Sequence, residues 1–244
     1  MSRAFEVTRE IDLPAAPDDV WTAITADTAA WQFPSGMEIP AGAAAPPEGA
    51  PVTTWDPPHR LVIRVESPDG TFNALDYSID AREGGTAHLR YVHSGILADE
   101  WEDQYDAIGG HTDFYLHTLG QYLEHFNGRQ VTYVGQPSAG IEGPEAAGAP
   151  DAMDALRAAL GVSSDARGGD VVHASLGDAG TLDGVVDYST AEFLGVRTAD
   201  GLYRFFGRNH FGGVVGMSAH LFVDGVDAAA SEAALEAWLD GVYA

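Results

Sequence analysis

Alternation of apolar and polar residues is the main pattern in the first half of the chain. Along residues 5–15 the odd-numbered positions from Phe5 to Leu13 are apolar except for Arg9, and the even-numbered positions between them are acidic or hydroxyl-bearing. A period of two predicts a strand with one buried face. The next run, "APDDVWTAIT" (16–25), predicts a short helix, because a proline and two aspartates suit its first turn.

A loop and four more strands are predicted next. Residues 37–51 are rich in Ala, Gly and Pro, which favours a loop. The turn sequences "PPH", "PDG" and "EGG" separate the following runs, which should therefore pair as antiparallel hairpins. The predicted strands are 51–56, 60–67, 72–82 and 86–95. Alternation places one set of side chains on a common face: Leu61, Ile63, Val65, Leu75, Tyr77, Ile79, Leu89, Tyr91 and His93.

The segment "GGHTDFYLHTLGQYLEHF" (109–126) predicts a long helix that begins after its two glycines and covers the apolar face of the sheet. The stripe predicted to face the sheet consists of Tyr115, Leu116, Leu119, Tyr122, Leu123 and Phe126. Beside it lies a mixed strip of His111, Phe114, Thr118 and His125. The residues predicted to face solvent are Asp113, His117, Gly120, Gln121 and Glu124. A mixed strip is expected of a helix that lines a partly filled cavity or touches a second domain.

The order of elements recurs in the second half. Residues 127–150 contain one strand-like run and then a Gly-, Pro- and Ala-rich tract that predicts a flexible connection. A helix at 150–160, several strand-like runs and a closing helix at 227–244 follow. We therefore predict an α+β fold of two tandem domains, residues 1–128 and 129–244, the second diverged in sequence from the first.

Composition and charge narrow the classes of partner. Hydrophobic residues make up 45% of the 244 residues, which is typical of a globular protein. The 37 Asp and Glu against 12 Lys and Arg give a formal net charge of −25, so neither nucleic acid nor a membrane is predicted as a partner. Salt adaptation, an acidic docking face and coding bias each account for this acidity. Without cysteine, an apolar leader or a membrane-length apolar run, the chain is expected to be cytoplasmic.

Nine histidines raise the question of a metal site. His111, His117 and His125 share the predicted closing helix, but their spacing scatters them around it, unlike the i, i+4 pair of a zinc helix. His88 and His93 are an odd number of residues apart on one strand and so point to opposite faces. No serine stands in a G-x-S-x-G elbow. The sequence therefore predicts no metal and no cofactor, and it assigns no catalytic residue.

Four stretches together resemble one known superfamily: "VTREIDLPAAPDDVWTAIT", "WDPPHRLVIRVES", "GGTAHLRYVHSGI" and "WEDQYDAIGGHTDFYLHTLGQYLE". Residues 3–126 are similar to the SRPBCC (START-like) superfamily, in the branch related to activators of heat-shock-protein-90 ATPase. The resemblance implies a helix-grip fold, in which an antiparallel sheet wraps around a long C-terminal helix, often with an apolar cavity between them. Thr112 departs from the pattern, since that branch usually has a tryptophan there.

The pattern and the resemblance together predict that the first domain binds a small apolar or aromatic molecule. Tyrosine hydroxyls and the inward His93 would orient a ligand in an otherwise apolar site. The candidate ligand-binding residues are Tyr77, Tyr91, His93, Trp101, Tyr105, His111, Tyr115, Thr118 and Tyr122. Plain packing accounts for the same residues. Two further functions stay open: a co-chaperone-like module that binds a chaperone or another copy of the chain, and a cyclase- or hydratase-type enzyme using His93 with a tyrosine.

Overall fold

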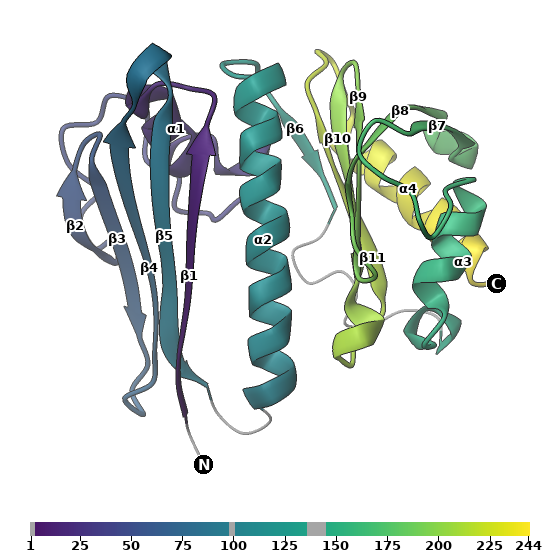
Figure 1. Ribbon diagram of the computed structural model, residues 1–244, viewed down its shortest axis with the longest axis horizontal. Helices are drawn as coiled ribbons and strands as arrows, with labels where there is room; N and C mark the ends of the chain where they lie inside the picture. Colours follow the sequence, from purple (N-terminus) through teal and green to yellow (C-terminus); the bar gives the residue numbers. More distant parts are fainter. Residues whose placement is uncertain (1–2, 98–100, 136–144) are drawn as a thin grey trace. The chain divides into compact units, whose positions relative to one another are not determined.

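The computed structural model describes residues 3–97, 101–135 and 145–244, and it divides into two compact units, Met1–Gly128 and Arg129–Ala244 (Figure 1). The described strands and α-helices of the first unit are β1 (Arg3–Leu13), α1 (Pro17–Thr25), β2 (Val52–Asp56), β3 (Arg60–Glu66), β4 (Phe72–Ala81), β5 (Ala87–Leu97) and α2 (Trp101–His125). The predicted strands match these strands to within two residues at either end, because alternation and turn residues mark both.

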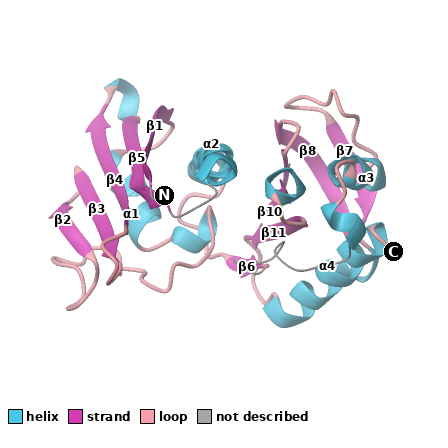
Figure 2. Ribbon diagram, turned by 90° about the horizontal axis from the view of Figure 1, so that it is seen from below, coloured by secondary structure: helices cyan, strands magenta, loops and turns pink. Residues whose placement is uncertain are grey.

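The strands of the first unit form one antiparallel sheet in the order β1-β5-β4-β3-β2, and α2 lies along one of its faces (Figure 2). β1 and β5 pair along their whole length, from Arg3 opposite Leu97 to Leu13 opposite Ala87. Residues directly opposite one another share a face of the sheet. One such row crosses the sheet from β1 to β2 and consists of Arg9, Tyr91, Tyr77, Leu61 and Trp55.

The row through Tyr77 lies on the face toward α2, because Arg9 at its end forms an ion pair with Asp113 of that helix. We call this face, made of the odd-numbered residues of β1, β3, β4 and β5, the inner face. The core of the first unit is built on it, together with side chains of α1 and α2. Its buried members include Val20, Trp21, Leu61, Ile79, Leu89, Leu119, Leu123 and Phe126.

The helix α2 begins earlier than the sequence predicts. It starts at Trp101, so Gly109 and Gly110 lie inside it and not ahead of its first turn. Glycine costs roughly 1 kcal/mol relative to alanine in a helix interior. Packing of one helix face against the rest of a protein generally contributes more than such propensities. The two glycines therefore interrupt the expected pattern without ending the helix.

The second unit repeats the order of the first with one strand more. Its described elements are β6 (Thr132–Val134), α3 (Ala152–Ala159), β7 (Val171–Ser175), β8 (Thr181–Ser189), β9 (Phe193–Thr198), β10 (Gly201–Gly207), β11 (Val215–Leu221) and α4 (Ala228–Val242). The sheet order is β6-β11-β10-β9-β8-β7. In both sheets the first strand pairs with the last, and the others follow in reverse order. The predicted α+β fold in two tandem, helix-grip-like copies is confirmed.

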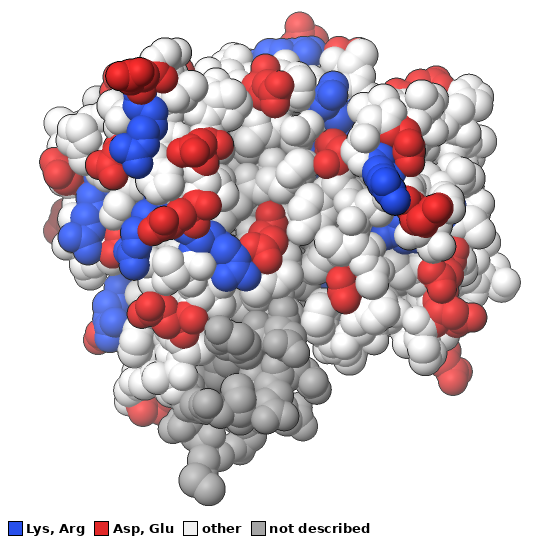
Figure 3. All heavy atoms as spheres, in the orientation of Figure 1, with Lys and Arg blue, Asp and Glu red and all other residues white. Residues whose placement is uncertain are grey.

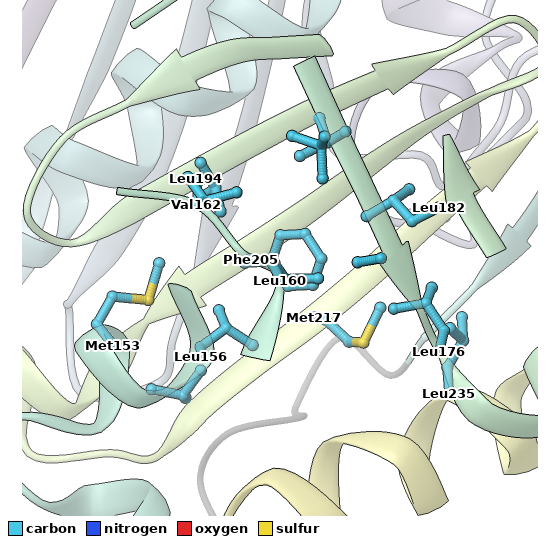
Figure 4. Close-up of a cluster of buried hydrophobic side chains, with 14 of the residues drawn as sticks. Met153, Leu156, Leu160, Val162, Leu176, Leu182, Leu194, Phe205, Met217 and Leu235 are labelled. Carbon is cyan, nitrogen blue, oxygen red and sulfur yellow. The ribbon is translucent and has the colours of Figure 1, made fainter. Parts of the chain in front are cut away.

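One face of the second sheet packs on α3 and α4. Figure 4 shows Leu156 of α3, Phe205 of β10, Met217 of β11 and Leu235 of α4 in this core, where none is more than 6% exposed. The guanidinium of Arg157, which follows Leu156 on α3, donates to carbonyl oxygens at the β8–β9 connection. Apolar burial and these hydrogen bonds together fix α3 against the sheet.

A buried ion pair lies on the opposite face of the second sheet, since Arg204 precedes the inward Phe205. Arg204 of β10 places Nη1 at 2.9 and 3.0 Å from the two carboxylate oxygens of Asp187 on β8. The pair crosses β9 at Gly195, where a Cβ would lie 2.2 Å from Asp187 Oδ1 and 2.6 Å from Arg204 Nη1. Only glycine leaves room for this pair.

On the exterior, Figure 3 shows arginine side chains bordered by acidic ones. On the outer face of the first sheet, Arg60 Nη2 lies 2.8 Å from Asp76 Oδ2, and Arg64 Nε lies 2.7 Å from Glu66 Oε1. Exposed pairs of this kind contribute about 0–1 kcal/mol each, so they arrange surface charge more than they stabilise the sheet. In the part of the chain that the structure describes, no helix has the length and apolarity needed to cross a membrane.

Candidate functional site

Two of the predicted site residues, Tyr77 and Tyr91, lie side by side at the centre of the inner face. They are direct partners on β4 and β5, and their ring centroids are 5.0 Å apart at an interplanar angle of 57°. Tyr77 is 3% exposed and Tyr91 8%. Burial raises the pKa of Tyr77 well above its ordinary value, with the neighbouring Tyr91 adding to the effect. Both phenols therefore stay protonated at neutral pH, because burial also raises the pKa of Tyr91.

The two hydroxyls differ in their partners. Tyr91 has a hydrogen bond with the side chain of Thr112 on α2, which partly offsets the effect of burial on its pKa. No hydrogen bond joins the Tyr77 hydroxyl to a described residue, and its oxygen is not among the fully enclosed polar atoms that lack a partner. The Tyr77 hydroxyl is therefore an unused hydrogen-bonding group at the centre of the inner face.

His93 lies in the next row of the inner face, between Val7 and Leu75. Its Nε2 is 2.7 Å from Asn73 Oδ1, and its ring stands edge-on to Phe5 at 5.1 Å. An amide oxygen only accepts, so Nε2 carries the proton and Nδ1 keeps a lone pair. Burial lowers the pKa of His93 to about 4, which makes the imidazole neutral at pH 7.

A glycine explains how the Phe5 ring reaches His93. Gly95 lies opposite Phe5 in the sheet. A Cβ on Gly95 would be 2.6 Å from Phe5 Cε1 and 2.6 Å from the Phe72 carbonyl oxygen. The missing side chain lets the Phe5 ring lie over the backbone of β5, where it covers one side of the imidazole.

An ion pair joins the inner face to α2. Arg9 Nε contacts Asp113 Oδ1, and Arg9 Nη2 lies 3.1 Å from Asp113 Oδ2. The Asp113 side chain is 42% exposed, as predicted, but it also pairs with Arg9 through both carboxylate oxygens, which the sequence did not predict. This bidentate geometry fixes the direction of the helix relative to β1. It also balances the positive charge of the Arg9 guanidinium.

Trp55 and Asn73 belong to the same surroundings, but they are not among the predicted site residues. Trp55 lies at the β2 end of the row that contains Tyr77, directly opposite Leu61 of β3. Its indole stands edge-on to Trp21 of α1, with centroids 4.8 Å apart. Its Nε1 is buried and has no hydrogen-bond partner among the described residues. The register across the "PPH" turn could have identified Trp55, since it places this residue opposite Leu61.

The predicted site residues of α2 have partners of other kinds. His111 Nδ1 donates to the Ala107 carbonyl oxygen at 2.7 Å, and the Thr118 hydroxyl donates to the Phe114 carbonyl oxygen at 2.8 Å. These groups bond to their own helix, so the mixed strip presents fewer polar groups than its sequence suggests.

Tyr115 and Tyr122 also lie on α2. The Tyr115 ring stands edge-on to Phe33 at 6.1 Å. The Tyr122 hydroxyl donates to Asp27 Oδ2 at 3.0 Å and accepts from the Gly128 N–H at 3.3 Å, which ties the end of the helix to the segment after α1. The side chains of Trp101 and Tyr105 lie outside the described part of the structure.

Among the described residues, no three His, Asp or Glu side chains lie close enough together to bind a metal ion. The polar groups of the inner face are instead suited to hydrogen bonding with an organic molecule: one phenol and one indole N–H without partners, and one neutral imidazole. Their arrangement supplies orientation but no assigned nucleophile.

No protein-family model matches the sequence, and no curated protein matches it. Solved structures do match. MLL2253 from Mesorhizobium loti is 17% identical, with a TM-score of 0.39 over 50% of this chain and 98% of its own. The Aha1 dimer from Colwellia psychrerythraea is 18% identical, with a TM-score of 0.38 over 49% of this chain and 96% of its own. The matched fold is of the Aha1-domain/SRPBCC type.

One further match spans both units. DynU16, a protein of the dynemicin biosynthetic locus, is 13% identical, with a TM-score of 0.37 over 98% of this chain and 95% of its own. At identities this low the likeness concerns the fold alone, and no ligand or reaction follows from it.

Proposed function

We propose that the first unit binds a small apolar or aromatic molecule against the inner face of its sheet. The Tyr77 hydroxyl carries this proposal, because the Tyr77 side chain is 3% exposed and no described residue hydrogen-bonds to its oxygen. A molecule that hydrogen-bonds to Tyr77 would remove the cost of leaving this group unpaired. The unpaired hydroxyl is thus easier to explain in a binding protein than in a core that serves stability alone.

The surroundings of Tyr77 favour an apolar partner. Leu61 and Ile79 beside it are each 1% exposed, and the Tyr91 ring covers another side. Burial of the apolar surface of a ligand contributes about 25 cal/mol per Å², which would be the main driving force for binding. Tyr91 and His93 would orient the ligand, as would the remaining predicted residues wherever they reach it.

The enzymatic alternative, with His93 as a general base, is less well supported. A general base works best when its pKa lies near the working pH. Burial lowers the pKa of His93 to about 4, and Nε2 is already engaged by Asn73. Such an imidazole is a hydrogen-bonding group more than a proton acceptor. A chaperone partner and self-association remain predictions, which a pull-down at two salt concentrations and light scattering would test.

The test of the binding proposal uses two neighbouring positions on β3. Ile63 shares the inner face with Leu75 and His93, whereas the adjacent Val62 points to the outer face. Ile63→Trp should fill space beside Tyr77 and weaken binding at least tenfold, and Val62→Trp should leave binding unchanged. Circular dichroism would check that both variants fold.

Native mass spectrometry and equilibrium dialysis with fatty acids, sterols and polycyclic aromatics would measure binding to the full chain. A one-to-one complex that Ile63→Trp weakens and Val62→Trp preserves is the expected result. If no compound binds, or if both variants bind equally well, the inner face is not a ligand site.

A further inference from the structure

Trp55 presents a second hydrogen-bond donor in the row of Tyr77. The two residues flank Leu61 on neighbouring strands, so their backbones are about 10 Å apart. The Trp55 Nε1–H is buried and has no partner among the described residues. An indole N–H only donates, and a protonated phenol readily donates. The row thus offers two donors that no described residue uses.

The charges around these donors are balanced. Arg9, at the far end of the row, is paired with the Asp113 carboxylate. The phenols of Tyr77 and Tyr91 and the imidazole of His93 are uncharged at neutral pH. A ligand with a net charge would lose its hydration here without gaining a free counter-charge from this ion pair. The row therefore favours an uncharged molecule over an ionised one.

We infer that the ligand is an uncharged aromatic molecule with a carbonyl oxygen, and that Trp55 Nε1–H and Tyr77 Oη–H both donate hydrogen bonds to that oxygen. This inference rests on the proposed function and specifies the chemistry of the ligand. It also explains why Trp55 is a tryptophan at an edge strand: the ring packs on Trp21, and the N–H remains available. Carbon-only surfaces of the same shape would bind through apolar burial alone.

Three probes of one shape test this inference: 9-fluorenone, fluorene, which lacks the carbonyl group, and a 9-fluorenone carboxylate. Affinities are measured by tryptophan fluorescence and calorimetry on the full chain at pH 7.5. One hydrogen bond corresponds to about 3- to 10-fold in affinity. With two such bonds, we expect 9-fluorenone to bind about 10- to 100-fold more tightly than fluorene, and at least about 10-fold more tightly than its carboxylate.

The variants Tyr77→Phe and Trp55→Phe each remove one donor and keep an aromatic ring. Each should weaken 9-fluorenone about 3- to 10-fold and change fluorene less than twofold. Tyr203→Phe, which removes a hydroxyl from the second unit, is the control and should change neither affinity. Calorimetry is essential for Trp55→Phe, because the substitution also removes a fluorophore.

The outcomes separate this inference from the proposed function. If wild type binds 9-fluorenone and fluorene equally, or if either variant leaves the preference intact, the donor assignment is wrong while ligand binding stands. If the carboxylate binds best, the neutral character of the site is wrong. If neither neutral probe binds, the donor assignment is wrong. If no compound of the earlier panel binds either, the proposed function is wrong as well.

Discussion

Two tyrosines of the first unit are buried, but their hydroxyls differ in their partners, so removing each hydroxyl should change stability differently. Tyr122 is fully buried, and its hydroxyl bonds to Asp27 Oδ2 at 3.0 Å and to the Gly128 N–H at 3.3 Å. Tyr77 is 3% exposed and has no hydrogen-bond partner among the described residues. Tyr122→Phe and Tyr77→Phe each delete one oxygen atom and keep the ring in place.

The expected magnitudes follow from the bonds that each variant loses. A hydrogen bond to a charged group contributes about 1.5–3 kcal/mol, so Tyr122→Phe should lower the free energy of unfolding by about that amount. Tyr77→Phe breaks no bond to a described residue and removes a polar atom from an apolar environment. It should leave the free energy of unfolding unchanged or raise it by up to about 2 kcal/mol.

Urea denaturation at pH 7 measures both values, with tryptophan fluorescence as the signal. This signal reports mainly on the first unit, since Trp238 is the one tryptophan outside residues 1–128. Equal m-values in the variants would show that the same transition is being compared. If Tyr77→Phe destabilises the unit as much as Tyr122→Phe does, the Tyr77 hydroxyl has a stabilising partner, and the reasoning behind the binding site is refuted.

Three further predictions concern other positions. His93 should titrate near pH 4 by NMR, because burial lowers its pKa in the folded state. Its contribution to the free energy of unfolding should be complete above pH 6.5 and should fall by about 1–2 kcal/mol as the pH is lowered toward 4. His93→Leu should not show this fall. Gly195→Ala should cost about 3 kcal/mol or more by disrupting the buried ion pair, whereas Gly241→Ala, with open space around it, should be neutral or stabilising in thermal melts. Arg157→Met should cost about 2–4 kcal/mol in urea, and an unchanged midpoint would contradict its role in holding α3.

The strands and their faces could be predicted because alternation acts locally. Every residue of "FNALDYSIDA" has its face fixed by its neighbours, and Tyr77 accordingly lies inward on β4. The start of α2 could not be predicted in the same way. Gly109 and Gly110 favour a break by local propensity, and packing that involves distant residues overrides it.

The candidate site was predictable in part. Tyr77, Tyr91 and His93 follow from the alternation of β4 and β5, and the structure places them on one face. Whether a hydroxyl is free or engaged depends on residues far away in the chain: the partner of Tyr122 is Asp27, 95 positions earlier. No local pattern carries that information, so the sequence could not separate the anchored Tyr122 from the unpartnered Tyr77.

The pairing of first with last strands has a consequence for biosynthesis. Arg3 finds its partner only at Leu97, and Thr132 finds its partner only at Leu221. At a synthesis rate of about 5–20 residues per second, β1 leaves the ribosome roughly 5–20 s before β5 exists. Contacts so distant in sequence also slow folding itself. During that interval the backbone N–H and C=O groups of β1 are unpaired and could pair with another chain. Repulsion between the acidic residues along its outer side would keep nascent copies apart.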